Sequence, residues 1–222
     1  MKLREAEIRL QTLVGKNLNQ IAKDFNVSLY GPKGSLKKGW VEDIVETYTA
    51  GSKSNKIEKV FEDTELKLVP ISINSKNNSV AVKSYLSICV ITEDELLKKT
   101  FSKSSLYRNI SSLLVGLYAQ DIKNKDSAVF LGVKTFKLGG KLLKIVKDDY
   151  ALLRKFVKNE GLDSVSGSPS VPCKFFNMKS KNLKGKPRRV FTINPKDVLE
   201  HILSLSNYEY KKLQSLALTV HR

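Results

Sequence analysis

The sequence predicts a mixed α/β fold in which helices flank a mixed central sheet. Apolar residues recur at intervals of three and four in several stretches, as they do in amphipathic helices. Runs rich in Val, Ile, Leu, Tyr and Phe, bounded by turn-forming residues, alternate with those stretches and predict about five strands. The 222 residues are enough for one domain with a substantial core.

The N-terminal part is predicted to be helical. Leu3 to Val14 and Leu18 to Phe25 have helical apolar spacing, and the second resembles the first helix of a helix-turn-helix. This spacing raises an alternative, a non-catalytic DNA-binding regulator. However, Gly31-Pro32-Lys33-Gly34 breaks the chain where a recognition helix would have to follow.

The next helix and the next strand each present a polar face opposite a packed one. A helix is expected from Lys38 to Ala50, with Glu46 roughly opposite its apolar stripe. A strand is expected from Glu65 to Ile71. Because side chains alternate across a strand, Glu65 and Lys67 share one face, and the intervening leucines pack on the other.

The rest of the chain continues to mix strands and helices. After a turn, a long apolar run should pair with the preceding strand as a hairpin, and a Thr-capped helix should follow. The expected elements are strands at Val80–Ile91, Leu113–Tyr118, Val129–Phe136 and Arg189–Ile193, and helices from Thr92, at Asp148–Asn159, at Pro195–Leu205 and at Tyr208–Leu218, with a linker at Leu106–Asn109 and loops at Ser164–Pro172 and Lys174–Arg189.

Three carboxylates and one ammonium are spaced so that they could meet near the start of the strand at Glu65. Glu58 lies seven residues upstream of Glu65, and Glu46 lies twelve residues before Glu58. Mg²⁺ takes oxygen ligands, commonly one or two carboxylates together with substrate phosphate. Such an ion, with Lys67 beside it, suits phosphodiester hydrolysis. The alternative is that Glu65 and Lys67 form the solvated face of an edge strand.

Short motifs follow one another in a fixed order along most of the chain. They are Lys37-Lys38-Gly39-Trp40, Glu46, Ala50-Gly51-Ser52-Lys53, Thr64-Glu65-Leu66-Lys67-Leu68-Val69-Pro70, Ile145-Val146-Lys147-Asp148-Asp149-Tyr150, Asn159-Glu160-Gly161, Val171-Pro172-Cys173-Lys174 and Arg189-Val190-Phe191-Thr192-Ile193. Together they resemble the MutH-type endonuclease family, which includes the mismatch-repair enzyme MutH and related GATC restriction endonucleases of the PD-(D/E)XK nuclease class.

The resemblance implies a single domain over residues 1–222, shaped as a restriction-endonuclease-like cleft of two lobes. The N-terminal catalytic lobe would span about 1–105 and the C-terminal DNA-reading lobe about 106–222. The cofactor implied is Mg²⁺, which Mn²⁺ can replace. The partner implied is double-stranded DNA.

The family's catalytic positions fall on Glu46, Glu65 and Lys67. The resemblance implies that Glu65 and Glu58 hold the metal ion, and that Glu46 binds a second ion or acts through water. Glu58 stands where the family usually has Asp after Pro, and its extra methylene group moves the carboxylate. A further family lysine falls near Arg108-Asn109, where we expect Arg108 to serve.

The segment from Lys174 to Arg189 is strongly basic, with seven Lys or Arg among sixteen residues and no acid. Lysine and arginine bind the phosphate backbone, while Asn and Arg also read base edges. In the resembled family this loop reads the recognition sequence; the alternative is a solvated loop. The expected DNA contacts are Lys53, Lys174, Asn177, Lys179, Lys181, Lys184, Lys186, Arg188 and Arg189.

Composition supports a polyanion partner and excludes several other chemistries. The 39 Lys and Arg outnumber the 22 Asp and Glu, giving a net charge of +17 that favours phosphate backbones. The sequence has no long apolar run and opens without a signal peptide, so we expect a cytoplasmic protein that does not contact membranes. Two cysteines and two histidines, without ligand spacing, do not support a disulfide scaffold, a zinc site or a Cys-His nucleophile.

The resemblance therefore implies a Mg²⁺-dependent, sequence-specific double-stranded DNA endonuclease, a type II restriction enzyme that cuts at GATC. One alternative is a mismatch-repair nicking endonuclease, which would act with a mismatch-repair partner. A second is a catalytically inactive DNA-binding module or regulator. Cutting both strands requires either two copies on one site, as a homodimer, or two successive nicks.

Overall fold

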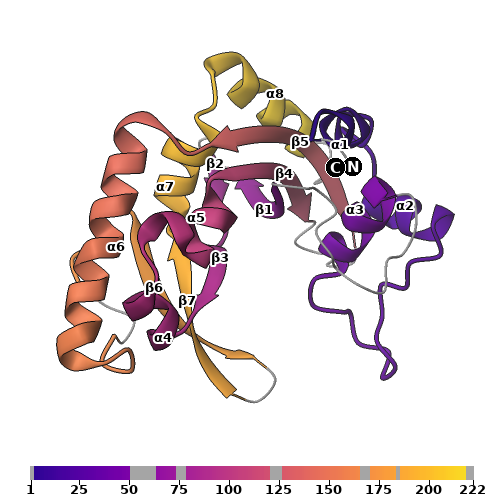
Figure 1. The fold of residues 1–222 in the computed structure, drawn as a ribbon. Helices are drawn as coiled ribbons and strands as arrows, with labels where there is room; N and C mark the ends of the chain where they lie inside the picture. Colours follow the sequence, from indigo (N-terminus) through magenta and orange to yellow (C-terminus); the bar gives the residue numbers. More distant parts are fainter. Residues whose placement is uncertain are drawn as a thin grey trace. The chain divides into compact units, whose positions relative to one another are not determined.

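The computed structural model describes residues 3–50, 64–73, 79–120, 127–165, 171–183 and 186–218. Helices and strands alternate along the chain (Figure 1). In order, the elements are α1 (Leu3–Gln11), α2 (Leu18–Asp24), α3 (Trp40–Ala50), β1 (Glu65–Ile73), β2 (Val80–Val82), β3 (Leu86–Ile91), α4 (Glu93–Lys98), the short helix η1 (Phe101–Lys103), α5 (Ser105–Ile110), β4 (Ser112–Gln120), β5 (Ala128–Lys137), α6 (Gly140–Glu160), β6 (Phe176–Leu183), β7 (Lys186–Ile193), α7 (Pro195–Asp197), the π-helical η2 (Val198–Leu203) and α8 (Asn207–Leu218).

The chain divides into two compact units, each assembled from separate stretches. The first unit comprises residues 1–83, 114–135 and 203–222, and the second comprises 84–113 and 136–202. A mixed four-stranded sheet with the order β2-β1-β4-β5 and a three-stranded sheet with the order β3-β7-β6 form the strand framework. This arrangement confirms the predicted α/β class with helices flanking sheets.

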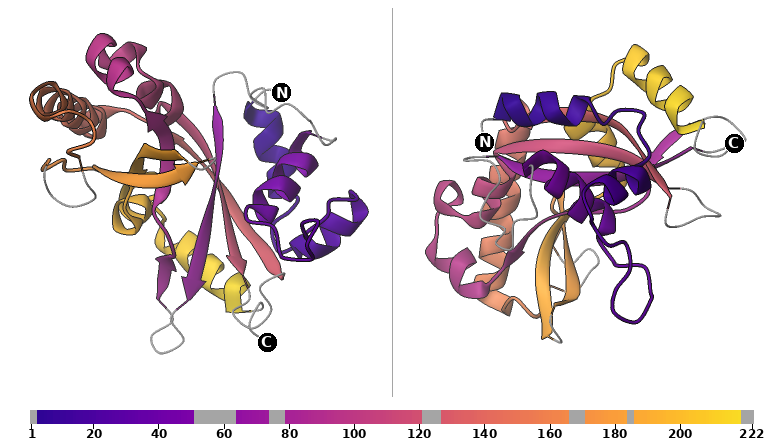
Figure 2. Two further views of the ribbon diagram at one scale, coloured as in Figure 1. Left: turned by 90° about the horizontal axis from the view of Figure 1, so that it is seen from below. Right: turned by 90° about the vertical axis from the view of Figure 1, so that its right-hand side faces the viewer.

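In the first unit, the N-terminal helices share one hydrophobic core with β1, β4 and β5. Buried side chains of α1 to α3, among them Leu10, Ile21 and Ile44, pack with Leu114 and Phe130. Figure 2 shows these three helices gathered on one side of the sheet. The buried apolar residues of α3 lie on the predicted apolar stripe. The opposite face of α3 is therefore left for polar side chains.

One glycine allows the strands of this sheet to pack closely. A Cβ atom placed on Gly116 of β4 would lie 2.5 Å from Leu68 Cδ2 and 2.9 Å from Phe130 Cε2. Any larger residue would therefore push β1 and β5 side chains out of place. Leu68 is one of the two leucines on the packed face of β1, so Gly116 helps to set the position of that strand.

In the second unit, the antiparallel sheet β3-β7-β6 carries its own core. β6 and β7 pair from Phe176↔Ile193 to Leu183↔Lys186, and β3 pairs with the other edge of β7. Phe176, Met178, Phe191 and Ile193 are buried. α6 supplies a second apolar face through Val146, Tyr150, Leu153 and Val157.

The structure corrects the predicted strands at two places. The strand expected over Val80–Ile91 is two strands in different sheets, because the exposed residues 83–85 separate β2, which pairs with β1, from β3, which pairs with β7. The described residues therefore form seven strands in two sheets rather than about five in one. The loop expected over Lys174–Arg189 is mostly the β6–β7 hairpin.

Three helical predictions also change. Leu106–Asn109 is not a linker but part of α5, whose N-terminus is capped by Ser104 Oγ accepting the Tyr107 amide. α6 begins at Gly140, before the expected start at Asp148. The helix expected from Pro195 becomes π-helical at Val198. By contrast, the predicted Thr92 cap is confirmed, since its hydroxyl accepts the Glu95 amide.

The helix-turn-helix alternative lacks its second helix. Residues 25–39 contain no helix between α2 and α3, and Tyr30 and Leu36 instead form an isolated antiparallel bridge. None of the described helices has the length and apolar character needed to cross a bilayer.

Candidate active site and DNA-contact surface

The first polar site lies at the start of β1. Lys67 Nζ forms an ion pair with Glu65 Oε1, and the two side chains are 18% and 35% exposed. Farther along the same face, Val69 and Ile71 are buried at 1% exposure each. The acid and the amine are therefore more exposed than the two residues that follow them on this face, while Leu66 and Leu68 pack against the core as predicted.

Glu46 on α3 is within range of the Lys67 charge. Burial and the neighbouring carboxylates of Asp43 and Glu42 raise the pKa of Glu46, whereas the positive charge of Lys67 lowers it. The influence of Lys67 requires the two side chains to lie within Coulombic reach. The structure thus pairs Glu65 with Lys67 and leaves Glu46 within Coulombic range of Lys67.

This donor set suits a hard divalent cation. Glu46 and Glu65 supply oxygen ligands, which Mg²⁺ prefers. Burial and like charges make the ionised form of Glu46 costly, and a bound cation would offset both effects. Two other predicted site residues, Glu58 and Lys53, lie outside the described residues.

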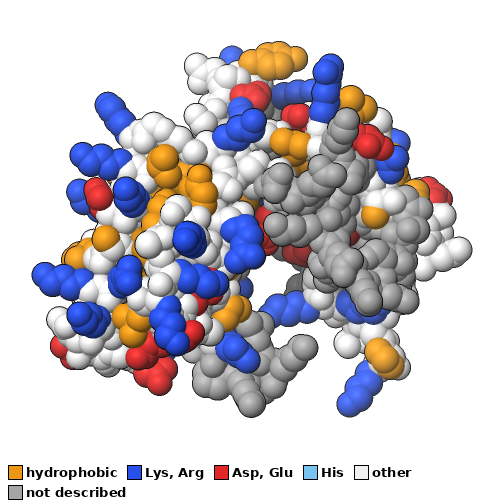
Figure 3. Space-filling view, in the orientation of Figure 1, with side chains coloured by type: hydrophobic (Ala, Val, Ile, Leu, Met, Phe, Trp, Pro, Cys, Tyr) orange, Lys and Arg blue, Asp and Glu red, His pale blue; other side chains and the backbone are white. Residues whose placement is uncertain are grey.

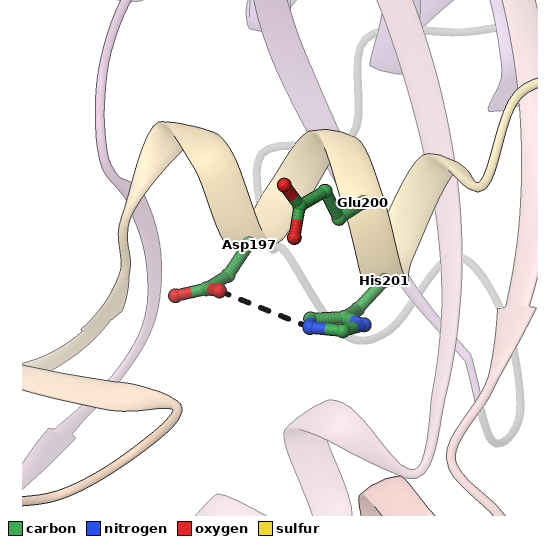
Figure 4. Close-up of side chains that lie close together, drawn as sticks. All are labelled: Asp197, Glu200 and His201. Carbon is green, nitrogen blue, oxygen red and sulfur yellow. Dashed lines mark ion pairs between the residues drawn. The ribbon is translucent and has the colours of Figure 1, made fainter.

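A different group of potential metal ligands lies on α7 and η2. One ligand atom each from Asp197, Glu200 and His201 lies within 4.8 Å of the others (Figure 4). Protein contacts account for this group. Asp197 and Asn194 cap the helix start reciprocally, with Asn194 Oδ1 accepting the Asp197 amide at 2.9 Å. Glu200 Oε1 lies 3.9 Å from Lys196 Nζ. We therefore assign no metal role to this group.

Arg108 lies on α5 in the second unit, with an exposed side chain. An exposed guanidinium group can bind a phosphate. Its assignment to the catalytic set stays a prediction.

The β6–β7 hairpin carries most of the predicted DNA contacts. The register places Asn177, Lys179 and Lys181 on one face of the hairpin together with Arg188, the cross-strand partner of Lys181. We call these four residues the basic face. Lys174, Asn177, Lys181 and Arg188 are exposed, and Figure 3 shows Lys and Arg side chains spread over the elements of this unit.

Two members of the basic face already contact β3 or the residue before it. Lys179 Nζ lies 3.1 Å from the centroid of the Tyr85 ring, and Lys181 Nζ donates to Ser87 Oγ. The sequence reasoning missed Tyr85 and Ser87, because their proximity depends on pairing of β3 with β7. The only local signal was their alternation with apolar residues.

Arg189 lies on the opposite face of the hairpin from Arg188. Its Nη2 donates to the Asp163 carbonyl oxygen at 2.7 Å, so it connects the hairpin to the segment after α6. Lys184 lies outside the described residues, and of Lys186 only the backbone is described.

A protein-family model matches part of the chain. The family is described as DNA mismatch repair enzyme MutH, and the match spans residues 47–149. Residues 47–149 therefore match the MutH family. The match confirms the predicted resemblance over these residues, and at family level it supports a MutH-like nuclease that binds DNA.

The MutH match covers Glu58, Glu65, Lys67 and Arg108, begins one residue after Glu46 and ends before the β6–β7 hairpin. The matched stretch includes β1, which carries Glu65 and Lys67. No curated protein matches the chain.

Proposed function

We propose that the protein is a Mg²⁺-dependent, sequence-specific endonuclease of double-stranded DNA, a type II restriction enzyme that cuts at GATC in the cytoplasm. The observation that carries the proposal is the ion pair of Glu65 with Lys67 inside the stretch that matches the MutH family, with Glu46 on α3 within Coulombic range of Lys67. The motif Glu65-Leu66-Lys67 fits the PD-(D/E)XK pattern, in which an acid and an amine two residues apart share one strand face.

Each residue has a proposed role. Glu65 and Glu58 hold the metal ion, and Glu46 assists through a second ion or a water molecule. Mg²⁺ held by these residues would polarise a phosphate oxygen and promote ionisation of its bound water. Lys67 holds the attacking water in position and stabilises negative charge on the phosphate, because its ammonium is kept beside Glu65.

The basic face of the hairpin is the proposed DNA-reading surface, with Lys174 and Arg189 flanking it. Lysines and arginines there bind backbone phosphates, and Asn177 is suited to read a base edge. Lys53 and Arg108 are proposed to add phosphate contacts nearer the reacting bond. The single-domain boundary 1–222, the two-lobe cleft and action as a homodimer stay predictions.

A specific observation favours each of two alternatives. The matched family is described by its repair enzyme, which favours a nicking endonuclease that acts with a mismatch-repair partner. Ile57-Glu58 in place of the family's usual Pro-Asp favours an inactive DNA-binding module.

A plasmid digest separates these functions. The wild-type protein should linearise unmethylated plasmid in Mg²⁺, or in Mn²⁺, and should leave it intact in EDTA. Sequencing of the ends should place the cuts at GATC. A nicking enzyme would yield open circles, and a binding module would retard DNA without cutting it.

The Lys67→Ala variant tests the catalytic assignment in the same digest. Removing one group that stabilises transition-state charge costs about 100- to 1000-fold in rate. Lys83→Ala, at the exposed residue that follows β2, is the control and should cut normally. Cutting by Lys67→Ala at the wild-type rate would refute the proposed role.

A further inference from the structure

The root of the β6–β7 hairpin is held by one buried carboxylate. Asp149 on α6 is 4% exposed. Its Oδ1 accepts the Lys174 amide at 2.8 Å, and its Oδ2 accepts the amides of Phe175 at 2.7 Å and Phe176 at 3.2 Å. Three successive backbone N–H groups therefore converge on one side chain.

Three amides on one carboxylate form a strong anchor. Hydrogen bonds to an ionised acceptor are about twice as strong as neutral ones, and burial excludes competing water. Asp149 makes no ion pair within the described residues. The three backbone N–H dipoles therefore compensate its negative charge. A buried charge that lost them would be costly.

The anchored residues connect directly to the core and to the basic face. Phe175 and Phe176 are buried, and the Phe176 ring lies 5.3 Å from that of Phe191 on β7. Asn177, the first member of the basic face, is the next residue along β6. The position of the anchor thus determines where β6 leaves the core and which side chains its exposed face carries.

We propose that Asp149 is a positioning residue for DNA recognition: it fixes the direction and register of the hairpin, so that the basic face meets the duplex in one arrangement. This inference rests on the proposed DNA-reading role of the hairpin. It assigns to α6 a part in sequence discrimination, although the Asp149 side chain itself touches no DNA.

The chemistry of Asp149 indicates which substitution tests the proposal. Asparagine has nearly the same shape, but it offers one acceptor oxygen and places an NH₂ group against backbone donors. Asp149→Asn should therefore loosen the hairpin root without opening a cavity. Asp148→Asn is a matched control, because it makes the same change at the exposed neighbouring residue.

The measurement compares binding to two short duplexes, one with GATC and one with those four bases scrambled. Ca²⁺ replaces Mg²⁺ to prevent cutting. Asp149→Asn should lose about tenfold or more in affinity for the GATC duplex, as expected when charge-assisted hydrogen bonds are lost, and little for the scrambled duplex. Asp148→Asn should retain wild-type discrimination.

The outcomes separate this inference from the proposed function. If the wild-type protein does not discriminate between the duplexes, the proposed sequence-specific function fails. If it discriminates and a folded Asp149→Asn discriminates equally well, the positioning role is refuted.

A second measurement on the wild-type protein does not depend on the variant folding. Amide hydrogen exchange at Lys174, Phe175 and Phe176 should be as slow as at the paired amides of β7. Exchange at the rate of an exposed loop would contradict the anchor.

Discussion

The ammonium group of Lys67 on β1 lies near enough to the Glu46 carboxyl on α3 to lower its pKa, yet burial and two neighbouring acids raise that pKa overall. The fold therefore holds an acid where its ionised form is disfavoured. Such a position is typical of functional sites, where stability is traded for a charge that a ligand or substrate will use.

This relationship predicts that Glu46→Gln makes the metal-free protein more stable. Because the folded state raises the pKa of Glu46 above 4.5, its ionisation costs folding free energy at neutral pH. The variant should have a higher Tm at pH 7 to 8 in EDTA, and the difference should shrink as the pH falls through 4.5 and vanish at lower pH, where the carboxyl is protonated in both states.

The same variant should lose function. Its cleavage rate should fall about 10- to 100-fold, as for groups that support a metal site. The stabilisation of wild type by Mg²⁺ should shrink in Glu46→Gln. A lower Tm at pH 7 together with normal cleavage would show that Glu46 is a structural acid.

Gly116→Ala tests the close packing that positions β1. The new methyl group would meet Leu68 and Phe130 at distances that real Cβ atoms avoid, so we expect a loss of about 1–3 kcal/mol in the free energy of unfolding. Gly132→Ala on β5 is the control, since its nearest neighbour, Leu213, is 3.9 Å away. Urea denaturation curves would measure both, and equal midpoints would contradict the packing argument.

Arg188 on the basic face should bind mainly a phosphate of the DNA backbone. Arg188→Gln should weaken binding to all duplexes and reduce the slope of log K against log salt concentration by about 0.9, the value for one phosphate contact. Lys196→Gln, at an exposed lysine of α7, should leave the slope unchanged. A loss confined to GATC duplexes, with an unaltered slope, would instead indicate that Arg188 reads a base.

Local patterns predicted the elements whose side chains alternate or repeat strongly. β1 begins at Glu65 as expected, because its alternation of charged and apolar residues needs no tertiary information. α3 follows its apolar stripe in the same way. The acid and amine on β1 were identified from spacing and from the family resemblance.

Tertiary contacts determined the elements that the sequence did not predict. The stretch from Lys174 to Arg189 is too polar to read as strands, but it pairs with β3 through β7 and is anchored by Asp149. The division of Val80–Ile91 between two sheets depends on which partner each half finds. No local period contains that information.

A diffraction measurement on crystals soaked in Mn²⁺ tests the central claim most directly, because anomalous scattering locates the ion without prior assumptions. We predict an ion bound to the Glu65 carboxylate, with a second oxygen ligand from Glu58 or Glu46. An ion found only at Asp197, Glu200 and His201, with Glu65 still paired to Lys67 alone, would contradict the account.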